Sequence, residues 1–519
     1  MKRILTLLLC CIVTANLATA QSKVFKEVND EISSDMEAII QDGALVGYLA
    51  FTQLEKVSED SFNYKITIMD ENLNDLGTVL FRNRQLKLQA VSFEQDVLCL
   101  AYLKSNIIGK QFKNKKAFDA VSGSQKNELV VDFLSLDGKV IKSNSIPVDI
   151  KVNFYPAFAN GKSTVTGTLK KTLQLKNIPQ KGFACYYADE TANNLVLFGV
   201  EGKRLWKKKI PETLGYSLLT TTEDIYLLTK IKDDMLEGGH SIFSYGVQDS
   251  AAYIKYPLTD KDGNMLKVVG FGNDAITGKP YVAGAIIHPK KGNRFYKGKG
   301  LANGAYMGVY SINFNGRKKE DIKETFTYWS DGSKSPEIST HGKFADNGAF
   351  LNFDKVIRDY QGNTYFVGSS LERKPRWVSI GLSVVCLPLI IVSPYIMIAS
   401  GTQKCRVKDA MIVKLNDKGV LSFDNTIDCN TSKYLRGAFP ISYYDSKNFY
   451  PVSNSATQSN YIIVDDKKDI VIYNINKKKI ARTIPHKEGN TRTSVYPAKE
   501  GHIMAVSYTH LTLPTNREV

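Results

Sequence analysis

Short apolar runs separated by polar turns fill most of the chain, and they recur in a fixed order. One recurring phrase is two apolar runs joined by a polar turn, as in "YSLLTTTEDIYLLTKI" and "VIRDYQGNTYFVGSS". The next phrase places an Asp, Asn or Gly turn between two further runs, as in "YMGVYSINFNGRKKEDI" and "AMIVKLNDKGVLSFDNTI". Short runs rich in Val, Ile, Tyr and Phe and bounded by turn residues are typical of β-strands. Each pair of phrases therefore predicts four antiparallel strands.

The recurrence of this unit predicts an all-β fold, a β-propeller of about seven four-stranded blades. One such sheet cannot bury both of its faces alone, and radial stacking of copies does so. The first blade lacks an innermost strand, which Thr493–Gly501 is expected to supply. A two-domain β-sandwich is the structural alternative. The propeller is predicted to span residues 44–505, with blades near residues 44–82, 87–146, 182–210, 216–258, 266–326, 350–427 and 450–485.

The N-terminus has the pattern of a secretory signal peptide. Lys2 and Arg3 precede the apolar run "ILTLLLCCIV", and Ala18-Thr19-Ala20 is an A-x-A cleavage site. Residues 1–20 are therefore predicted to be removed before Gln21, which places the mature chain in the periplasm or outside the cell. An uncleaved membrane anchor is the alternative. Residues 21–43 are expected to form a partly helical segment, with a short helix over Val24–Ile40.

The C-terminal end breaks the pattern. The segment "VSYTHLTLPTNREV" (Val506–Val519) has no apolar periodicity and resembles a translated sequencing adapter. Residues 506–519 are therefore set aside as an artefactual tail.

One long apolar stretch, Trp377–Gly401, carries no charge and is long enough to cross a bilayer. It lies between two strands expected to pair in one blade, and a single crossing would separate them. Pro388 and Pro394 also interrupt any helix there. The stretch is therefore predicted to be an apolar hairpin inserted in the sixth blade, with a transmembrane helix as the alternative.

The formal net charge of +16 is concentrated in three loop insertions, at residues 104–127, 287–304 and 371–408. Each carries +5, and each is expected to join the second and third strands of its blade. Such loops emerge on one face of a propeller, so the insertions are predicted to converge as a basic surface. This surface suits an anionic membrane, an anionic glycan or another envelope protein, with peripheral membrane association. The predicted contact residues are Lys113, Lys115, Lys116, Lys290, Lys291, Arg294, Lys297, Lys299, Arg373, Lys374, Arg376 and Trp377.

Five cysteines follow the signal peptide, and their odd number and wide spacing argue against a disulfide framework. Cys405 and Cys429 could form a disulfide in an oxidising compartment, and two free thiols are the alternative.

The common motifs for catalysis, metal ions and nucleotides are absent from the chain. The chain contains no H-E-x-x-H, G-x-S-x-G or Walker motif, and its histidines lack metal-ligand spacing. The sequence "DKDGN" (Asp260–Asn264) begins like a calcium loop but lacks the acidic twelfth position, so it predicts a turn. No catalytic residue, metal site or cofactor is therefore predicted, and an exported chain argues against nucleic acid. The sequence favours a binding or scaffold protein over an enzyme. The alternative is a glycoside hydrolase or lyase that uses carboxylates such as Asp233, Asp234 and Glu237 in the propeller cleft.

Several phrases of the chain, including "SFNYKITIMDENLND", "KGFACYYADETANNLVLF" and "YNINKKKIARTIPHKEG", resemble an uncharacterised family of exported bacterial proteins. The resemblance covers nearly the whole mature chain. It implies a propeller-like all-β fold in the envelope or outside the cell, and it carries no catalytic residues.

Overall fold

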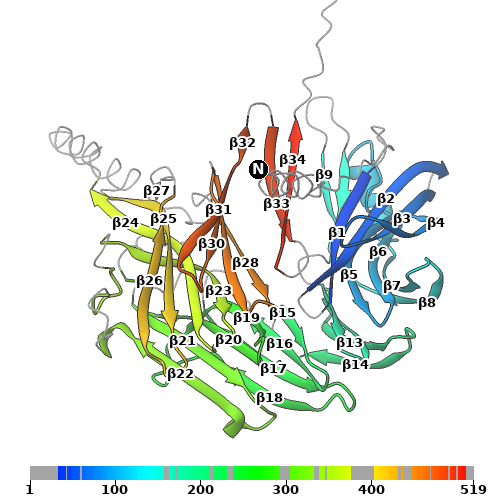
Figure 1. The fold of residues 1–519 in the computed structure, drawn as a ribbon. Coiled ribbons are helices and arrows are strands. Elements are labelled where there is room, and N and C mark those ends of the chain that lie inside the picture. Colours follow the sequence, from blue (N-terminus) through cyan, green and yellow to red (C-terminus); the bar gives the residue numbers. More distant parts are fainter. Residues whose placement is uncertain are drawn as a thin grey trace, which may run out of the picture. The chain divides into compact units, whose positions relative to one another are not determined.

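The computed structural model describes residues 33–509 with gaps, and within them the chain is largely β-strand (Figure 1). The chain divides into two compact units: unit 1 comprises residues 1–171 with 199–203, and unit 2 comprises residues 172–198 with 204–519. Each unit is described by itself. The gaps are residues 42–43, 59–60, 157–162, 168, 170–172, 211–213, 231–237, 291–303, 332–337, 345–347, 376–402, 430–434, 437–446, 468, 489–490 and 498–500.

Unit 1 contains two four-stranded sheets, each of which follows the chain as an antiparallel meander. The two sheets share one apolar core, in which Phe51 and Tyr64 of the first sheet meet Tyr102 of the second. The strands are β1 (Ser33–Gln41), β2 (Ala44–Ser58), β3 (Ser61–Asp70) and β4 (Asp75–Arg84), then β5 (Leu86–Glu94), β6 (Val97–Ser105), β7 (Asn127–Ser135) and β8 (Val140–Pro147). Helix α2 (Lys115–Ser122) lies between β6 and β7, and β9 (Asn153–Tyr155) pairs with β10 (Thr164–Thr166).

Unit 2 contains five further meanders of the same kind. Their strands are β11 (Gln174–Ile178), β12 (Gly182–Ala188), β13 (Asn193–Gly199) and β14 (Arg204–Ile210); β15 (Leu214–Thr220), β16 (Asp224–Lys230), β17 (His240–Gly246) and β18 (Ala252–Pro257); β19 (Leu266–Asn273), β20 (Pro280–Ile287), β21 (Tyr306–Phe314) and β22 (Ile322–Tyr328); β23 (Phe350–Arg358), β24 (Thr364–Pro375), β25 (Gln403–Leu415) and β26 (Leu421–Ile427); and β28 (Asn448–Asn454), β29 (Ser459–Asp465), β30 (Asp469–Asn474) and β31 (Lys479–Pro485).

The remaining elements of unit 2 are short and lie at the ends of these sheets. Strand β27 (Leu435–Arg436) adds to β25, while β32 (Lys487–Glu488), β33 (Thr491–Pro497) and β34 (Ile503–Thr509) form a separate three-stranded sheet. The 3-10 helices are η1 (Lys319–Asp321) and η2 (Trp329–Asp331).

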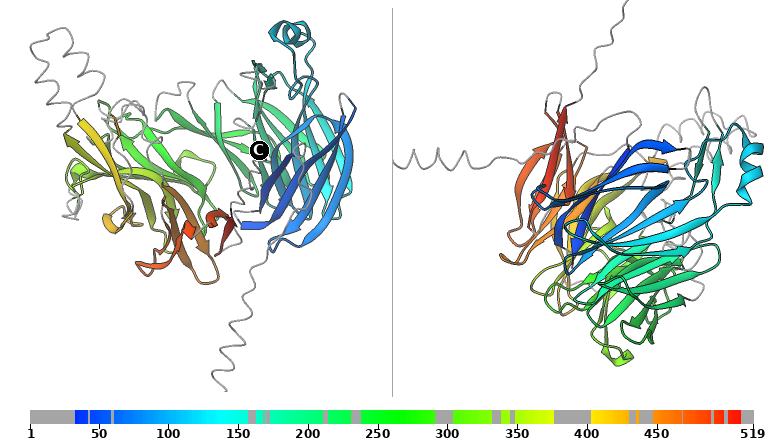
Figure 2. Two further views of the ribbon diagram at one scale, coloured as in Figure 1. Left: turned by 90° about the horizontal axis from the view of Figure 1, so that it is seen from above. Right: turned by 90° about the vertical axis from the view of Figure 1, so that its right-hand side faces the viewer.

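Consecutive sheets of unit 2 pack face to face, and their first strands lie in contact with one another. The second strands of the inner sheets are therefore covered on both faces, and every residue of β20 is buried. The fourth strands lie at the outside, so residues 204–209 of β14 and 422–426 of β26 are all exposed or half-buried. Figure 2 follows the meanders in chain order by colour. Burial from neighbouring copies on both faces is the property that defines a propeller blade.

The predicted fold class, an all-β propeller with about seven four-stranded blades, is thus confirmed. We number the blades 1 to 7 in chain order, so blades 1 and 2 belong to unit 1 and blades 3 to 7 to unit 2.

Two predictions for the ends of the chain are wrong. The helix expected over Val24–Ile40 is strand β1 from residue 33 onward, because these residues complete the first sheet as its first strand; residues 24–32 lie outside the described part. Blade 1 therefore needs no strand from Thr493–Gly501, and β33 pairs with β32 and β34 instead. Strand β34 extends into the segment set aside as an adapter, as far as Thr509. The origin of that tail stays a prediction.

The Trp377–Gly401 stretch lies outside the described residues, but its flanks are informative. Strands β24 and β25 remain paired up to the Pro375–Gln403 partners, so both ends of the insertion leave blade 6 together. The described helix α2 is too short and too polar to cross a bilayer.

Candidate functional site

The three basic insertions lie between the second and third strands of blades 2, 5 and 6. Strands β24 and β25 extend into both ends of the predicted 371–408 insertion, to Pro375 and from Gln403. Blades 5 and 6 are neighbours in unit 2, so their two insertions leave the same end of the packed sheets. Blade 2 belongs to unit 1, and the predicted convergence of all three insertions stays untested.

The blade 2 insertion shares a small aromatic core with strand β9. Phe118 of α2 stacks on Phe154 at 5.5 Å between ring centroids and meets Phe112 edge-on at 5.7 Å. Asn114 caps the helix by accepting a hydrogen bond from the Ala117 backbone N–H at 2.9 Å. Three of the predicted contact residues surround this helix start, and all are exposed: Lys113, Lys115 and Lys116. The first turn holds no acidic residue, so the positive end of the helix dipole adds to their charge.

Of the other nine predicted contact residues, three lie in the described part of the chain. Lys290 is exposed, and its backbone N–H donates to His288 Nδ1 at 3.1 Å. Arg373 and Lys374 lie in β24, opposite Cys405 and Lys404. The others fall outside the described residues: Lys291, Arg294, Lys297, Lys299, Arg376 and Trp377.

Cys429 is a free thiol in the structure, and its pairing with Cys405 stays a prediction. Burial raises the pKa of the Cys429 thiol to about 11, so it stays protonated at neutral pH. The Cys405 side chain lies outside the described part.

A groove that the sequence did not reveal runs between the outer strands of blades 4 and 5, β18 and β22. It encloses ≈ 390 Å³. Its aromatic walls are Tyr253 and Tyr256, and its lining includes the exposed Lys255, Lys261 and Lys319. The Nζ of Lys255 lies 5.9 Å from the centroid of the Phe243 ring. Tyrosine faces flanked by cations suit a ligand that has both flat apolar faces and negative charge.

Hydrogen bonds hold both tyrosine rings in place. The Tyr256 hydroxyl donates to Glu324 Oε1 at 2.5 Å, and its ring meets Phe314 edge-on at 5.9 Å. Burial, and then this hydrogen bond, raise the pKa of Tyr256, so its hydroxyl stays a donor at neutral pH. The Tyr253 hydroxyl donates to Asp249 Oδ2 at 2.5 Å.

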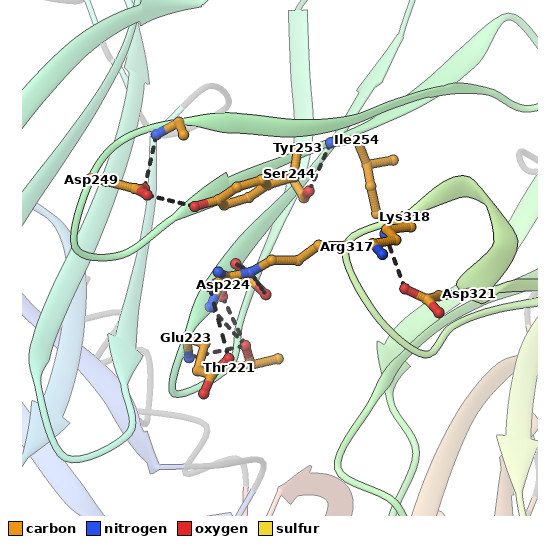
Figure 3. A network of polar contacts seen from close by, with 11 residues as sticks. Thr221, Glu223, Asp224, Ser244, Asp249, Tyr253, Ile254, Arg317, Lys318 and Asp321 are labelled. Carbon is orange, nitrogen blue, oxygen red and sulfur yellow. Dashed lines mark hydrogen bonds and ion pairs between the residues drawn. The ribbon is translucent and has the colours of Figure 1, made fainter.

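A polar network fixes one end of the groove (Figure 3). Arg317 lies 4.4 Å above the Tyr253 ring, and its Nε donates to Asp224 Oδ1 at 3.0 Å. Asp224 starts β16, where its backbone N–H donates to the Thr221 hydroxyl at 3.0 Å. Lys318, which follows Arg317 in the chain, donates its backbone N–H to Asp321 Oδ2 at 3.1 Å. These contacts tie the loop that carries Lys319 to blade 4.

The two carboxylates of the groove are both occupied by hydrogen bonds. Asp260 accepts the backbone N–H groups of Asp262 and Asn264 at 3.0 and 2.7 Å, and the Tyr328 hydroxyl at 2.9 Å. The prediction of a turn at "DKDGN" is therefore confirmed. Glu324 accepts from Tyr256. Within the described residues, no group of three or more His, Cys, Asp or Glu side chains could hold a metal ion.

Two of the described histidines have structural surroundings. His240 is buried at the start of β17, and burial, followed by the charge of Lys230, lowers its pKa to about 4. His486 contacts Asp465 Oδ1 through Nε2 and the Thr493 carbonyl through Nδ1, the latter at 2.7 Å, which ties β33 to blade 7. The carboxylates Asp233, Asp234 and Glu237, considered for catalysis, lie outside the described residues.

The Tyr–Lys sequence of β18, "AYIKYP", is the signal that could have pointed to the groove. It could not be used without knowing that β22 lies opposite, because the two strands belong to different repeats.

Several solved structures are similar in fold. The Dos1 propeller has a TM-score of 0.39 at 5% identity, over 89% of this chain and 90% of that one. The WD40 domain of SCAP from fission yeast has a TM-score of 0.36 at 10% identity, over 91% and 96%. Dihydro-heme d1 dehydrogenase NirN has a TM-score of 0.36 at 11% identity, over 86% of this chain and 66% of that one.

Sequence comparison leads to a family rather than to an activity. No curated protein is significantly similar to the chain. A family of unknown function, DUF6770, matches residues 1–511, and the chain belongs to this family.

Proposed function

We propose that this protein is an exported, non-enzymatic binding protein whose ligand is an anionic glycan held in the groove between β18 and β22. The observation that carries the proposal is the combination of Tyr253 and Tyr256 with three exposed lysines along one groove. Sugar rings present flat C–H faces that pack on aromatic rings, and carboxylate or sulfate groups pair with lysine. A neutral glycan would leave the lysines without a role, and a small inorganic anion would leave the tyrosines without one.

Binding is favoured over turnover because the groove offers no free acid–base pair. Asp260 holds a turn together and Glu324 fixes Tyr256, so neither carboxylate is free to transfer a proton.

Export rests on the N-terminal pattern, and the mature protein is proposed to begin at Gln21 in the periplasm or outside the cell. N-terminal sequencing of exported protein tests this part, and an intact Met1 would contradict it.

The binding proposal is tested with polygalacturonate, an acidic polysaccharide, and dextran, a neutral one. Isothermal titration of the mature protein should show binding to polygalacturonate that weakens with salt, and weaker binding to dextran. Replacing Lys255, Lys261 and Lys319 together by alanine should reduce the affinity for polygalacturonate about tenfold or more, equivalent to ~1.4 kcal/mol.

The matched control replaces three exposed lysines of blade 7, Lys467, Lys477 and Lys479, by alanine. This variant loses the same net charge and should bind like the parent. Equal loss in both triple variants would show that binding follows net charge alone and would refute the groove. Release of reducing sugar ends would instead establish the carbohydrate-active enzyme.

A further inference from the structure

A second cavity, of ≈ 250 Å³, lies between blades 5 and 6. Blade 5 lines it with Ser311, Asn313, Lys323 and Thr325, and blade 6 with Arg358 and Thr364. Polar side chains dominate this lining, although the interfaces between consecutive blades are otherwise built from apolar cores.

The change from apolar to polar can be followed along a single strand. On β21, Tyr310, Ile312 and Phe314 face blade 4 and belong to the apolar core there. The residues that alternate with them point to the opposite face, toward blade 6. Val309 belongs to the apolar core shared with blade 6, whereas Ser311 and Asn313 line the cavity. Their partners on β22 are Thr325 and Lys323. One face of the strand thus keeps a continuous apolar core while the other turns polar.

The cavity wall holds buried polar atoms that are not satisfied. Among the described residues, neither Asn313 Oδ1 nor Arg358 Nε has a hydrogen-bond partner. The rest of the Arg358 guanidinium is fixed, by Asp274 Oδ2 at 3.0 Å and by the Ser311 hydroxyl at 2.7 Å. A buried acceptor without a donor is costly to the folded protein, so its retention indicates a donor from outside the chain, either a water molecule or a ligand hydroxyl.

The charges around the cavity indicate the chemistry of that partner. Asp274 is neutralised by its ion pair with Arg358. Two lysines remain at the cavity: Lys279, whose Nζ contacts the Asn315 carbonyl, and the exposed Lys323. The one further acidic side chain of the lining is Asp417, which is exposed. The cavity therefore offers an acceptor for a hydroxyl group beside an excess of positive charge.

We infer that this cavity binds a small hydroxylated carboxylate, a sugar acid. A ligand hydroxyl donates to Asn313 Oδ1, and the ligand carboxylate pairs with Lys323. The site is separate from the groove between β18 and β22 and does not depend on the function proposed for it.

Ligand-observed NMR with sodium D-glucuronate tests the inference, with glucose and acetate as probes that carry only one of the two groups. The parent should bind glucuronate at least about tenfold more tightly than either. Lys323→Ala should reduce glucuronate binding to the level of glucose without changing the melting temperature, because Lys323 is exposed. Lys467→Ala, remote in sequence and also exposed, should bind like the parent.

A second variant separates a ligand site from a structural one. Asn313→Leu replaces the orphan acceptor by an apolar group of similar size, so the melting temperature should rise while glucuronate binding is lost. A structural role for Asn313 would instead lower the melting temperature and leave binding unchanged, which would overturn the inference. Absence of glucuronate binding to the parent, or parent-like binding by Lys323→Ala, would overturn it as well. The triple variant of Lys255, Lys261 and Lys319 should still bind glucuronate, so the two proposals can fail separately.

Discussion

Arg358 of blade 6 binds Asp274 of blade 5 at 3.0 Å, with both side chains only 10% exposed. The guanidinium also lies 4.0 Å above the ring of Tyr281. The same arrangement occurs one interface earlier, where Arg317 binds Asp224 at 3.0 Å over the ring of Tyr253. In both places an aspartate near a first turn is joined to an arginine of the following blade, so unit 2 repeats one polar connection between successive blades.

The two connections should differ in strength because their burial differs. Arg358→Met leaves Asp274 buried without its partner and should lower the free energy of unfolding by about 3 kcal/mol. Asp224 is 10% exposed, but its partner Arg317 is 41% exposed, so removing the guanidinium lets water reach Asp224 and Arg317→Met should cost about 1 kcal/mol or less. Urea unfolding of both variants measures the difference. Equal losses would show that burial does not govern these pairs.

His240 should make the stability of the protein depend on pH. Its folded pKa of about 4 lies below the ordinary value of 6.5, because burial disfavours the charged ring. Between these values the unfolded chain binds a proton that the folded chain does not. The contribution is complete above pH ~6.5 and is lost as the pH falls toward ~4, up to about 3 kcal/mol in total.

Urea unfolding at pH 7.5 and pH 5 tests this, with His240→Gln as the variant that cannot titrate. The stability of the variant should fall less than that of the parent across this range. His502→Gln, at an exposed position, is the control and should follow the parent. An unchanged pH dependence in His240→Gln would contradict the prediction.

Gly368 in β24 should tolerate no side chain. A Cβ atom there would lie 1.8 Å from the backbone carbonyl oxygen of Asn352, and backbone atoms cannot rotate away. The close approach accompanies a bulge between Phe353 and Lys355 in the facing strand β23. Gly368→Ala should therefore cost about 3 kcal/mol or more in thermal or urea unfolding. Gly123→Ala is the control: its Cβ would meet no atom within 4 Å, so stability should be nearly unchanged.

The apolar insertion of blade 6 should be dispensable for folding. Pro375 and Gln403 already pair across β24 and β25, so a short Gly/Ser turn can replace Trp377–Ser400. We expect the deletion variant to keep the circular dichroism spectrum and melting temperature of the parent. Unfolding of this variant would show that the insertion belongs to the core.

The same deletion tests the predicted membrane contact. Co-sedimentation with anionic liposomes at low and high salt should show salt-resistant binding of the parent that the deletion removes. If the parent does not sediment with the liposomes, the membrane prediction fails.

The order of strands was predictable because it depends on neighbours in the sequence. The phrase around "VIRDYQGNTYFVGSS" encodes two apolar runs and the turn between them, in which Asp359 accepts the backbone N–H groups of Gln361 and Asn363. The strand β1 was missed because "SSDMEAII" mixes charged and apolar residues without strict alternation, and its burial comes from β2 and β5 rather than from its own pattern.

The groove and the cavity were not predictable, since each joins residues of different repeats. Tyr256 and Glu324 are 68 positions apart, and Arg358 and Asp274 are 84 apart. Their meeting depends on how two sheets pack, which a single chain pattern does not specify. The lysine-rich loops could be identified from the net charge of their sequences. The charge of a loop does not show which other loops lie beside it, so it does not locate a binding surface.

In all seven meanders the spatial order of strands equals their order along the chain. Every backbone pairing within a blade therefore joins strands that follow one another in the chain, through a short turn or one of the three insertions, and a blade can form soon after its last strand leaves the ribosome. Gene duplication or loss of one repeat would add or remove a whole sheet without rethreading its neighbours. Blade number in this family is accordingly expected to vary more readily than strand order within a blade.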